Sequence, residues 1–373
     1  MPRYRSLVGA VVASLPVLAI SGPAGHAAYL HPAVPAKPAV SSWRLDVTKH
    51  FGPAGYASGY SEILPISGHV WVFGGTNPGG QSVPVAETLV GNRWRPARLP
   101  ARLTDFLSAA SAPAPNDIWA ISDYGRYVLR WNGKSWRLAK SWRQAGALSD
   151  VVAVSPRNVW VFGTSAAGAR GLGTWHFNGS TWKPVTGAAG SIYRASAVSA
   201  HDIWAIVAGV RTDTVMHHGA RGWRVVRMPR SMAAIRWHDI LAKARTNVWM
   251  IGNTGSKTGI GKLVLAHWNG VSWSAVTTPI RAWAGQLAAV GRDRLLATGT
   301  TGWLVPTGVI LELTGTRHLT WTSISSTYGS GVTDVAYAPK TGALWASGGI
   351  LTRLGGDAAV WVMRLPRADA DRD

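Results

Sequence analysis

Residues 149–185, SDVVAVSPRNVWVFGTSAAGARGLGTWHFNGSTWKPV, contain four short apolar segments separated by turn signals. The runs DVVAVS and VWVFG flank a Pro-Arg-Asn turn, and TWHF and TWKPV flank an Asn-Gly turn. Apolar, β-branched and aromatic residues bounded by Gly, Pro and Asn are typical of strands joined by tight turns. This stretch is therefore predicted to form four antiparallel β-strands.

The same unit recurs along the chain. The first Trp of the unit, in its second strand, lies at Trp71, Trp119, Trp160, Trp204, Trp249 and Trp345. Between the last two, RDRLLATG aligns with TNVWMIGN and places Leu296 in the same position, so successive anchors lie 41 to 49 residues apart. Four strands per repeat of this length are the signature of a β-propeller blade. We therefore expect an all-β, seven-bladed β-propeller of four-stranded antiparallel blades over residues 41–366.

A second Trp marks the fourth strand of each unit, at Trp94, Trp136, Trp182, Trp223, Trp273 and Trp321. After the last anchor only AAVWVMRLP (358–366) remains, which corresponds to a third strand. The missing fourth strand is predicted at residues 41–47, SSWRLDV, which match GKSWRLAK and place Trp43 in the Trp position. Pairing the two ends of the chain would close the ring and remove two exposed strand edges.

The ends of the chain carry other signals. Residues 1–28 combine Arg3 and Arg5 with an apolar run over 7–20 and small residues at the end, which predicts a signal peptide. The run is too short for a comfortable membrane span, so we expect no transmembrane segment in the mature chain. Residues 29–40 are predicted to form a Pro-rich linker and 367–373 a short acidic tail. The expected product is a secreted or cell-wall-associated monomer.

Composition excludes several kinds of site. The chain has no Cys, so it has no disulfides, no thiolate catalysis and no Cys-based metal centre. Lys and Arg number 38 against 17 Asp and Glu, a formal net charge of +21. Such a charge favours anionic surfaces such as wall polymers, phospholipid or nucleic acid, although no motif indicates specific nucleic-acid recognition. The excess of Arg also fits GC-rich coding bias.

Arginine follows the fourth-strand Trp at Arg44, Arg95, Arg137 and Arg224. These residues predict a basic band on the outer strands, suited to an anionic wall polymer. The alternative is an ordinary solvated polar surface.

Two short motifs resemble those of known propellers. HVWVFGG (69–75), followed by Trp94, resembles a kelch repeat, and LWASGG (344–349) keeps the same Gly pair. The NGSTW and NGKSW turns resemble the end of the Asp-box of sialidase-like propellers. As a whole, the chain resembles the secreted, Trp-rich propellers of high-GC Gram-positive (actinobacterial-type) bacteria. The resemblance implies architecture only, because propellers host both binding modules and enzymes.

The candidate site lies where the loops that lead into the first strands meet around the channel. An aromatic residue recurs there, with Arg236 and Arg281 beside it: Tyr60, Phe106, Trp142, Tyr193, Trp237, Trp283 and Tyr328. Acidic residues follow at Glu62, Asp150, Asp239 and Asp334, and the equivalent positions in the other blades hold Ala109, Arg194 and Gln286. The pattern predicts a rim of aromatic platforms for sugar rings around a polar mouth. Alternatively the acids hold Ca²⁺, or the aromatics only wedge the blades and the acids only cap turns.

No strong catalytic motif is present. Galactose-oxidase-like chemistry requires a Cys, and the three Glu residues of the chain form no sialidase-like pattern. We therefore expect an exported non-enzymatic propeller that recognises a glycan or an anionic cell-envelope polymer, or a protein, through its loop face. No cofactor other than Ca²⁺ is indicated. The alternative is a secreted hydrolase or lyase that uses the acids at the channel mouth and His238.

Overall fold

The computed structural model describes residues 42–52, 57–78, 81–164, 171–188, 191–209, 212–255, 260–302, 305–316, 318–353 and 355–365. Within these ranges the chain forms antiparallel β-sheets and no α-helix, which confirms the predicted all-β class. The predicted signal peptide, the Pro-rich linker and the acidic tail lie outside the described residues. No helix in the described part is long and apolar enough to span a membrane.

Each of the first four sheets is built from four strands that follow one another in the chain. The first holds β2 (Ser58–Ile66), β3 (His69–Thr76), β4 (Val83–Val90) and β5 (Arg93–Pro96). The second holds β6 (Leu107–Ala114), β7 (Asp117–Ser122), β8 (Tyr127–Trp131) and β9 (Trp136–Ser141). The third holds β10 (Ala147–Ser155), β11 (Asn158–Thr164), β12 (Trp175–Phe177) and β13 (Trp182–Pro184). The fourth holds β14 (Ser191–Ser199), β15 (Asp202–Ala208), β16 (Thr214–Gly219) and β17 (Gly222–Val226).

The fifth sheet has seven strands because one long strand serves two groups of four. Its strands are β18 (Arg236–Ala244), β19 (Asn247–Asn253), β20 (Gly261–Trp268), β21 (Trp273–Val290), β22 (Arg294–Thr301), β23 (Thr307–Thr314) and β24 (His318–Ile324). Up to Ala282, β21 pairs with β20, and from Trp283 onward it pairs with β22. The sequence pattern did not predict this continuous strand, because it places a turn between the two halves.

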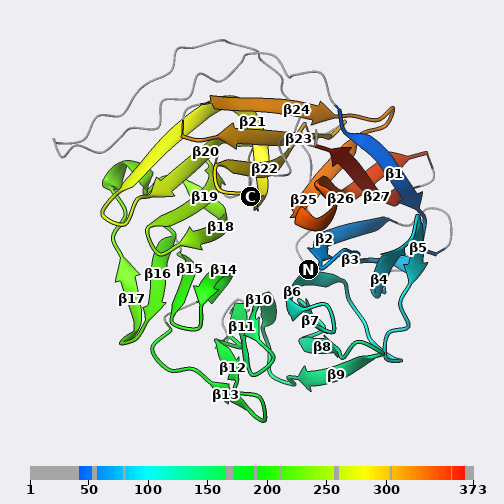
Figure 1. Cartoon of the computed structure of the whole chain (residues 1–373), viewed down its shortest axis with the longest axis horizontal. Helices are drawn as coiled ribbons and strands as arrows, with labels where there is room; N and C mark the ends of the chain where they lie inside the picture. Colours follow the sequence, from blue (N-terminus) through cyan, green and yellow to red (C-terminus); the bar gives the residue numbers. More distant parts are fainter. Residues whose placement is uncertain are drawn as a thin grey trace.

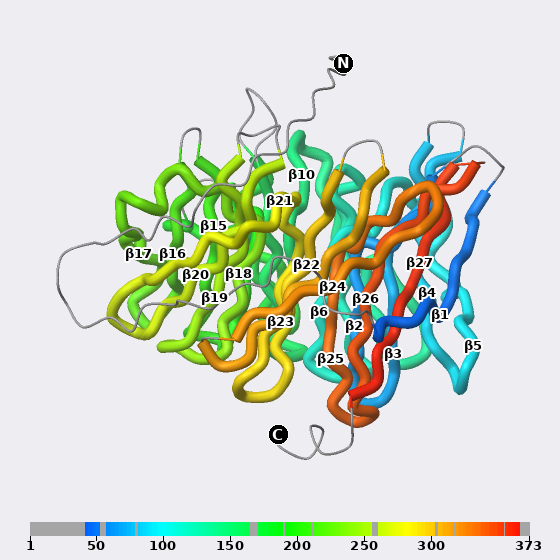
Figure 2. The backbone as a smooth tube through the Cα atoms, turned by 90° about the horizontal axis from the view of Figure 1, so that it is seen from above, coloured from blue at the N-terminus to red at the C-terminus, as the bar shows by residue number. Residues whose placement is uncertain are grey.

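The last sheet joins the two ends of the described chain. It runs in the order β25 (Ser330–Ala338), β26 (Ala343–Thr352), β27 (Gly355–Arg364) and β1 (Arg44–Lys49). Figure 1 shows the sheets around a central opening, with β2, β6, β10, β14, β18 and β25 nearest to it. Figure 2, at right angles, shows β1 beside β27. The N-terminal strand therefore lies on the outside of the sheet built by the C-terminal strands.

The anchor side chains are buried between neighbouring sheets. Trp71 meets Trp136 of the next sheet edge-on, with ring centroids 5.6 Å apart at 80°. The same contact recurs further along the chain, and between the last sheet and the first Trp345 meets Trp94 at 5.9 Å and 85°. An edge-to-face aromatic pair contributes about 0.5–1.5 kcal/mol beyond its buried area. Leu296 takes the anchor position of its repeat in a cluster against which Trp43 packs.

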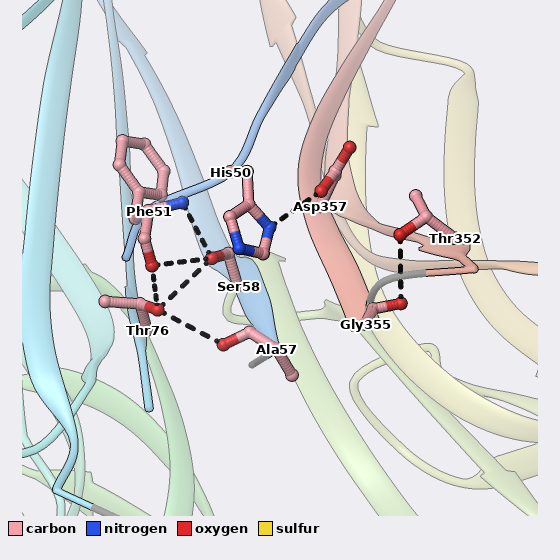
Figure 3. A network of polar contacts seen from close by, with 8 residues as sticks. All are labelled: His50, Phe51, Ala57, Ser58, Thr76, Thr352, Gly355 and Asp357. Atoms are coloured by element: carbon pink, nitrogen blue, oxygen red, sulfur yellow. Dashed lines mark hydrogen bonds and ion pairs between the residues drawn. The ribbon is translucent and has the colours of Figure 1, made fainter. Parts of the chain in front are cut away.

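The N-terminal strand β1 is bound by both of its neighbours. Asp46 accepts a hydrogen bond of 2.9 Å from the Trp94 indole, and Lys49 forms a 2.6 Å ion pair with buried Glu87. Beyond β1, Figure 3 shows a polar network that continues this attachment. The His50 ring lies 3.0 Å from the Asp357 carboxylate of β27, and the backbone N–H of Phe51 donates to Ser58 of β2 at 3.0 Å. The first and last sheets are thus joined through residues 46–51 and through Ser58.

Candidate functional site

A β-bulge recurs in the innermost strand of each group of four strands. In each, the pairing with the second strand slips at or just before the position predicted to face the channel. The extra residues are Ser61, Ser108, Ser149, Tyr193, His238, Thr333 and the Gly285–Gln286 pair. A bulge bends the strand and changes where the next side chain points. The structure thereby brings together Glu62, Asp150, Arg194, Asp239 and Gln286, which line one cavity of about 490 Å³.

Three of the predicted acids join neighbouring groups of four strands. Asp150 accepts a 2.7 Å hydrogen bond from the backbone N–H of Ala195 in the next sheet. Asp239 accepts the N–H of Leu287 at 2.7 Å, which links the two groups of four strands within the seven-stranded sheet. Asp334 accepts the N–H of Ile63 at 2.7 Å, which links the last sheet to the first. These acids therefore satisfy backbone N–H groups of the next group of four strands, and Asp150 and Asp334 also accept the N–H of the residue that follows each of them.

Serine takes over this role in two sheets that lack the acid. Ser111 accepts the N–H of Ala153, and Ser196 accepts the N–H of Ala242, both at 3.0 Å. Glu62 differs from the aspartates, because its one recorded hydrogen bond comes from the Gln286 amide at 3.4 Å. Among the four predicted acids, Glu62 is thus the one whose carboxylate accepts no hydrogen bond from a described backbone N–H.

Arg194 is the cation among these acids. Its guanidinium donates to the backbone carbonyl of Ser149 at 2.9 Å, and no described carboxylate lies within ion-pair distance of it. Burial works to lower the pKa of Arg194, but the charges of Asp150, Asp239 and Glu62 more than offset this and hold it above the ordinary value. The side chain therefore remains a cation inside the cavity.

The carboxyl groups respond in the opposite direction. Burial raises the pKa of Asp239 to about 7 although the nearby Arg194 charge opposes the shift. Burial also raises the pKa of Asp334 to about 7. The pKa of Glu62 lies well above its ordinary value, first because of burial and then because of the charge of Asp334. Of these three carboxyl groups, those of Glu62 and Asp239 line the cavity.

The predicted rim of aromatic platforms does not form as expected. Tyr60 and Trp237 are each 1% exposed and Trp142 is 6% exposed. The Tyr60 hydroxyl donates to Glu87, and the Trp142 ring packs edge-on against Trp175. These three side chains pack between sheets and offer no ring face to a ligand. That part of the site prediction was wrong.

The other aromatics are more open, but they are scattered. Phe106 is partly buried against Gly75, and the Tyr193 hydroxyl donates to the Trp237 carbonyl. Trp283 and Tyr328 are exposed, at 44% and 40%. Tyr328 is held by a hydrogen bond from Arg353. Only the last two rings can meet a ligand from solution.

The predicted basic partners of these aromatics are engaged elsewhere. Arg236 forms a 2.7 Å ion pair with buried Asp213. Arg281 is exposed and donates to the Ile260 carbonyl at 3.2 Å. Among the described residues, no three of the His, Asp and Glu side chains are grouped so as to hold a metal ion.

Basic side chains are concentrated on part of the outer wall, which we call the basic arc. It consists of Arg44, Arg93, Arg95, Arg98, Lys134, Arg137, Lys183, Arg221, Arg224, Arg227 and Arg230. All are exposed, and within the described ranges only Arg44 has a salt bridge, to Asp46 at 3.4 Å. Figure 1 shows the outer strands that carry or adjoin them, β1, β5, β9, β13 and β17, in sequence around the rim.

The remaining part of the outer wall carries fewer such charges. Residues 273–280 of β21 contain no Lys or Arg, and neither does β24, but Arg281, the next residue of the same half of β21, is exposed. The basic arc therefore covers five consecutive outer strands and stops at the seven-stranded sheet.

Sequence reasoning missed a polar motif on the second and third strands. The Asn158 side chain accepts hydrogen bonds from the Trp160 indole at 2.8 Å and from the His176 ring at 2.9 Å. Two further sheets repeat the motif with Asp202, Trp204 and His217 and with Asn247, Trp249 and His267. Burial lowers the pKa of all three histidines, so they remain neutral and structural. The sequence signal for this motif is a His in the third strand, which pairs with the anchor Trp of the second strand.

His238, the histidine of the enzymatic alternative, is the extra residue of the β18 bulge. Burial lowers its pKa, with the charge of Asp213 opposing the shift. It lies beside the cavity-lining Asp239 in sequence, but the cavity wall is formed by Asp239 and the residues that follow.

No protein-family model matches the chain, and no curated protein sequence matches it. Solved structures match it in shape. YCF48 bound to D1 peptide has a TM-score of 0.59 at 16% identity, over 88% of this chain and 97% of that chain. The chain has a β-propeller fold.

Two other propellers are similarly close in shape. A catalytically inactive virginiamycin B lyase from Staphylococcus aureus with quinupristin has a TM-score of 0.61 at 11% identity, over 87% of this chain and 100% of that chain. The WD40 repeats of RRP9 have a TM-score of 0.57 at 11% identity, over 87% and 98%. Because propellers with different activities match about equally well, these similarities establish the fold alone.

Proposed function

We propose that the chain is an exported binding propeller with seven blades, in which the seven-stranded sheet is two blades sharing β21. The pairing of β1 with β27 and the Asp334–Ile63 hydrogen bond support a ring closed between the chain ends. Closure leaves the outer wall and the two loop faces as the surfaces open to a partner. The N-terminal sequence pattern supports export.

The partner that this surface fits best is an anionic polymer of the cell envelope. The observation that carries the proposal is the basic arc, which presents eleven exposed Lys and Arg side chains. The outer strands within it contain one acid, Asp46. A long anionic chain can follow such a surface and neutralise several charges at once, which gives affinity that depends strongly on salt.

Two simpler explanations account for the arc less well. Coding bias toward Arg would scatter the charges over all outer strands. Charged side chains on edge strands also prevent edge-to-edge aggregation. That need applies equally to β24 and to residues 273–280 of β21, which carry no Lys or Arg. The uneven distribution therefore favours a partner.

The enzymatic alternative is weaker. Asp150 and Asp334 each accept two backbone N–H groups, so they are needed for the architecture. A glycan bound by stacking would have only Trp283 and Tyr328 as exposed rings of the predicted set. A protein partner remains compatible with the loop face, and one propeller of similar shape, YCF48, binds a peptide.

The test compares two double variants with equal charge change on a purified glycerol-phosphate polymer. Arg137→Glu/Arg224→Glu alters the arc, and Arg245→Glu/Arg292→Glu alters exposed turns of the seven-stranded sheet. We expect the arc variant to lose most of the binding seen by co-sedimentation at low salt, and the control variant to keep it. Equal losses would mean that only net charge matters and that the arc is not a site.

A further inference from the structure

The central cavity contains a carboxylate that the architecture does not use. Asp150, Asp239 and Asp334 follow the same bulge as Glu62 does in its strand, and each accepts a backbone N–H from the next group of four strands. Glu62 has one more methylene group, and its single recorded hydrogen bond is the 3.4 Å contact from Gln286. Most of its hydrogen-bonding capacity is therefore available within the cavity.

The same cavity contains a cation with spare donors. Arg194 carries five N–H groups, and one recorded hydrogen bond joins it to the Ser149 carbonyl. Both Arg194 and Glu62 line the cavity and retain solvent-accessible surface. Their strands, β14 and β2, lie on opposite sides of the central opening (Figure 1).

We propose that this cavity binds a small zwitterion, an amino acid or a short peptide with free ends. The ligand's ammonium group contacts Glu62, and its carboxylate contacts Arg194. The cavity volume of about 490 Å³ lies within the range of roughly 300–1,000 Å³ usual for ligand pockets. The proposal does not depend on the basic arc, because that surface lies on the outer wall.

Ligands of a single charge fit the cavity less well. A simple anion would contact Arg194 but would be repelled by Glu62, Asp150 and Asp239. A simple cation would be attracted by these acids but would leave Arg194 without a partner and would be repelled by it. A zwitterion satisfies both sides, and charge-assisted hydrogen bonds to each end are among the stronger polar contacts.

The probe is L-alanyl-L-alanine, compared by isothermal titration calorimetry with its N-acetylated and its C-amidated forms. Blocking either end should weaken binding by about ten- to a hundredfold, the usual effect of removing one charge-assisted hydrogen bond. A free dipeptide that gives no heat, or that binds no tighter than its blocked forms, would overturn the proposal.

Variants assign each end of the ligand to a side chain. Glu62→Gln should weaken binding of the free dipeptide but not of the N-acetylated form. Glu312→Gln, which alters an acid paired with Arg294 outside the cavity, should change neither. If Glu62→Gln leaves the preference for a free ammonium intact, Glu62 is not its partner and the proposal is wrong. The thermal midpoint of each variant confirms that it is folded.

Discussion

The Asp334 carboxylate accepts a 2.7 Å hydrogen bond from the backbone N–H of Ile63, a residue 271 positions earlier in the chain. Its other oxygen accepts the N–H of Val335 at 2.7 Å. One buried side chain thus joins the first strand of the last sheet to the first strand of the first sheet. The same arrangement at Asp150 joins two sheets that are consecutive in sequence.

Asp334→Asn should destabilise the protein by about 1–3 kcal/mol, because an amide can accept only one of the two N–H groups and leaves the other unpaired in a buried position. Urea unfolding measures the change. Asp293→Asn, in an exposed turn, is the matched control and should have little effect. An Asp334→Asn protein with the wild-type urea midpoint would show that this bond does not stabilise the join between the first and last sheets.

Deletion of residues 41–47 should lower the melting temperature far more than removal of residues 367–373, a segment of equal length. The first deletion removes most of β1 and with it the Asp46–Trp94 hydrogen bond, and it exposes the edge of β27. Calorimetric melting of the two truncated chains makes the comparison. Similar melting temperatures for both would contradict a ring closed through β1.

The fold could be predicted from the sequence because the residues that specify it are local and recur in each repeat. The anchor Trp residues, the fourth-strand Trp residues and the Asn-Gly turns each recur at fixed places in the repeat. Even the position of Leu296 followed from alignment with its neighbours. The pairing partner of residues 41–47 could be predicted because those residues match fourth strands and nothing at the C-terminus does.

The site could be predicted only in part, because it depends on bulges and on contacts between sheets. The sequence placed Glu62 and Arg194 at equivalent positions of two repeats. It could not show that a bulge precedes each of them or that both side chains line one cavity. Nor could it show that Trp237 is covered while Trp283 is exposed, since both occupy the same place in the repeat. Burial there depends on the length and path of the preceding connection.

Trp237→Ala should destabilise the fold by about 3–5 kcal/mol, the usual effect of removing a large buried side chain. Trp237 is 1% exposed, whereas Trp283 is 44% exposed. Trp283→Ala should therefore leave the urea midpoint close to that of the wild type. Equal destabilisation by both changes would contradict the assignment of one ring to the core and the other to the surface.

Stability should decrease as pH rises from about 4 to 7, because of the carboxyl groups of the cavity. The pKa of Asp239 is raised to about 7 in the folded chain, whereas it lies near 3.9 when unfolded. Between these values the folded state binds more protons than the unfolded state, so raising the pH favours unfolding.

Asp239→Asn removes this titration, and the dependence of unfolding free energy on pH should become flatter by up to about 1.4 kcal/mol per pH unit. Urea unfolding from pH 4.5 to 7.5 gives both curves. Parallel curves for the two proteins would show that Asp239 has no raised pKa.

The salt dependence of binding to a glycerol-phosphate polymer tests the central claim most directly. On a densely charged polymer, removing one Arg–phosphate ion pair should reduce the slope of log K against log salt concentration by about one unit. We predict a slope shallower by about two units for Arg137→Glu/Arg224→Glu and an unchanged slope for Arg245→Glu/Arg292→Glu. A wild-type slope for the first variant, or the same reduction in both, would contradict binding through the basic arc.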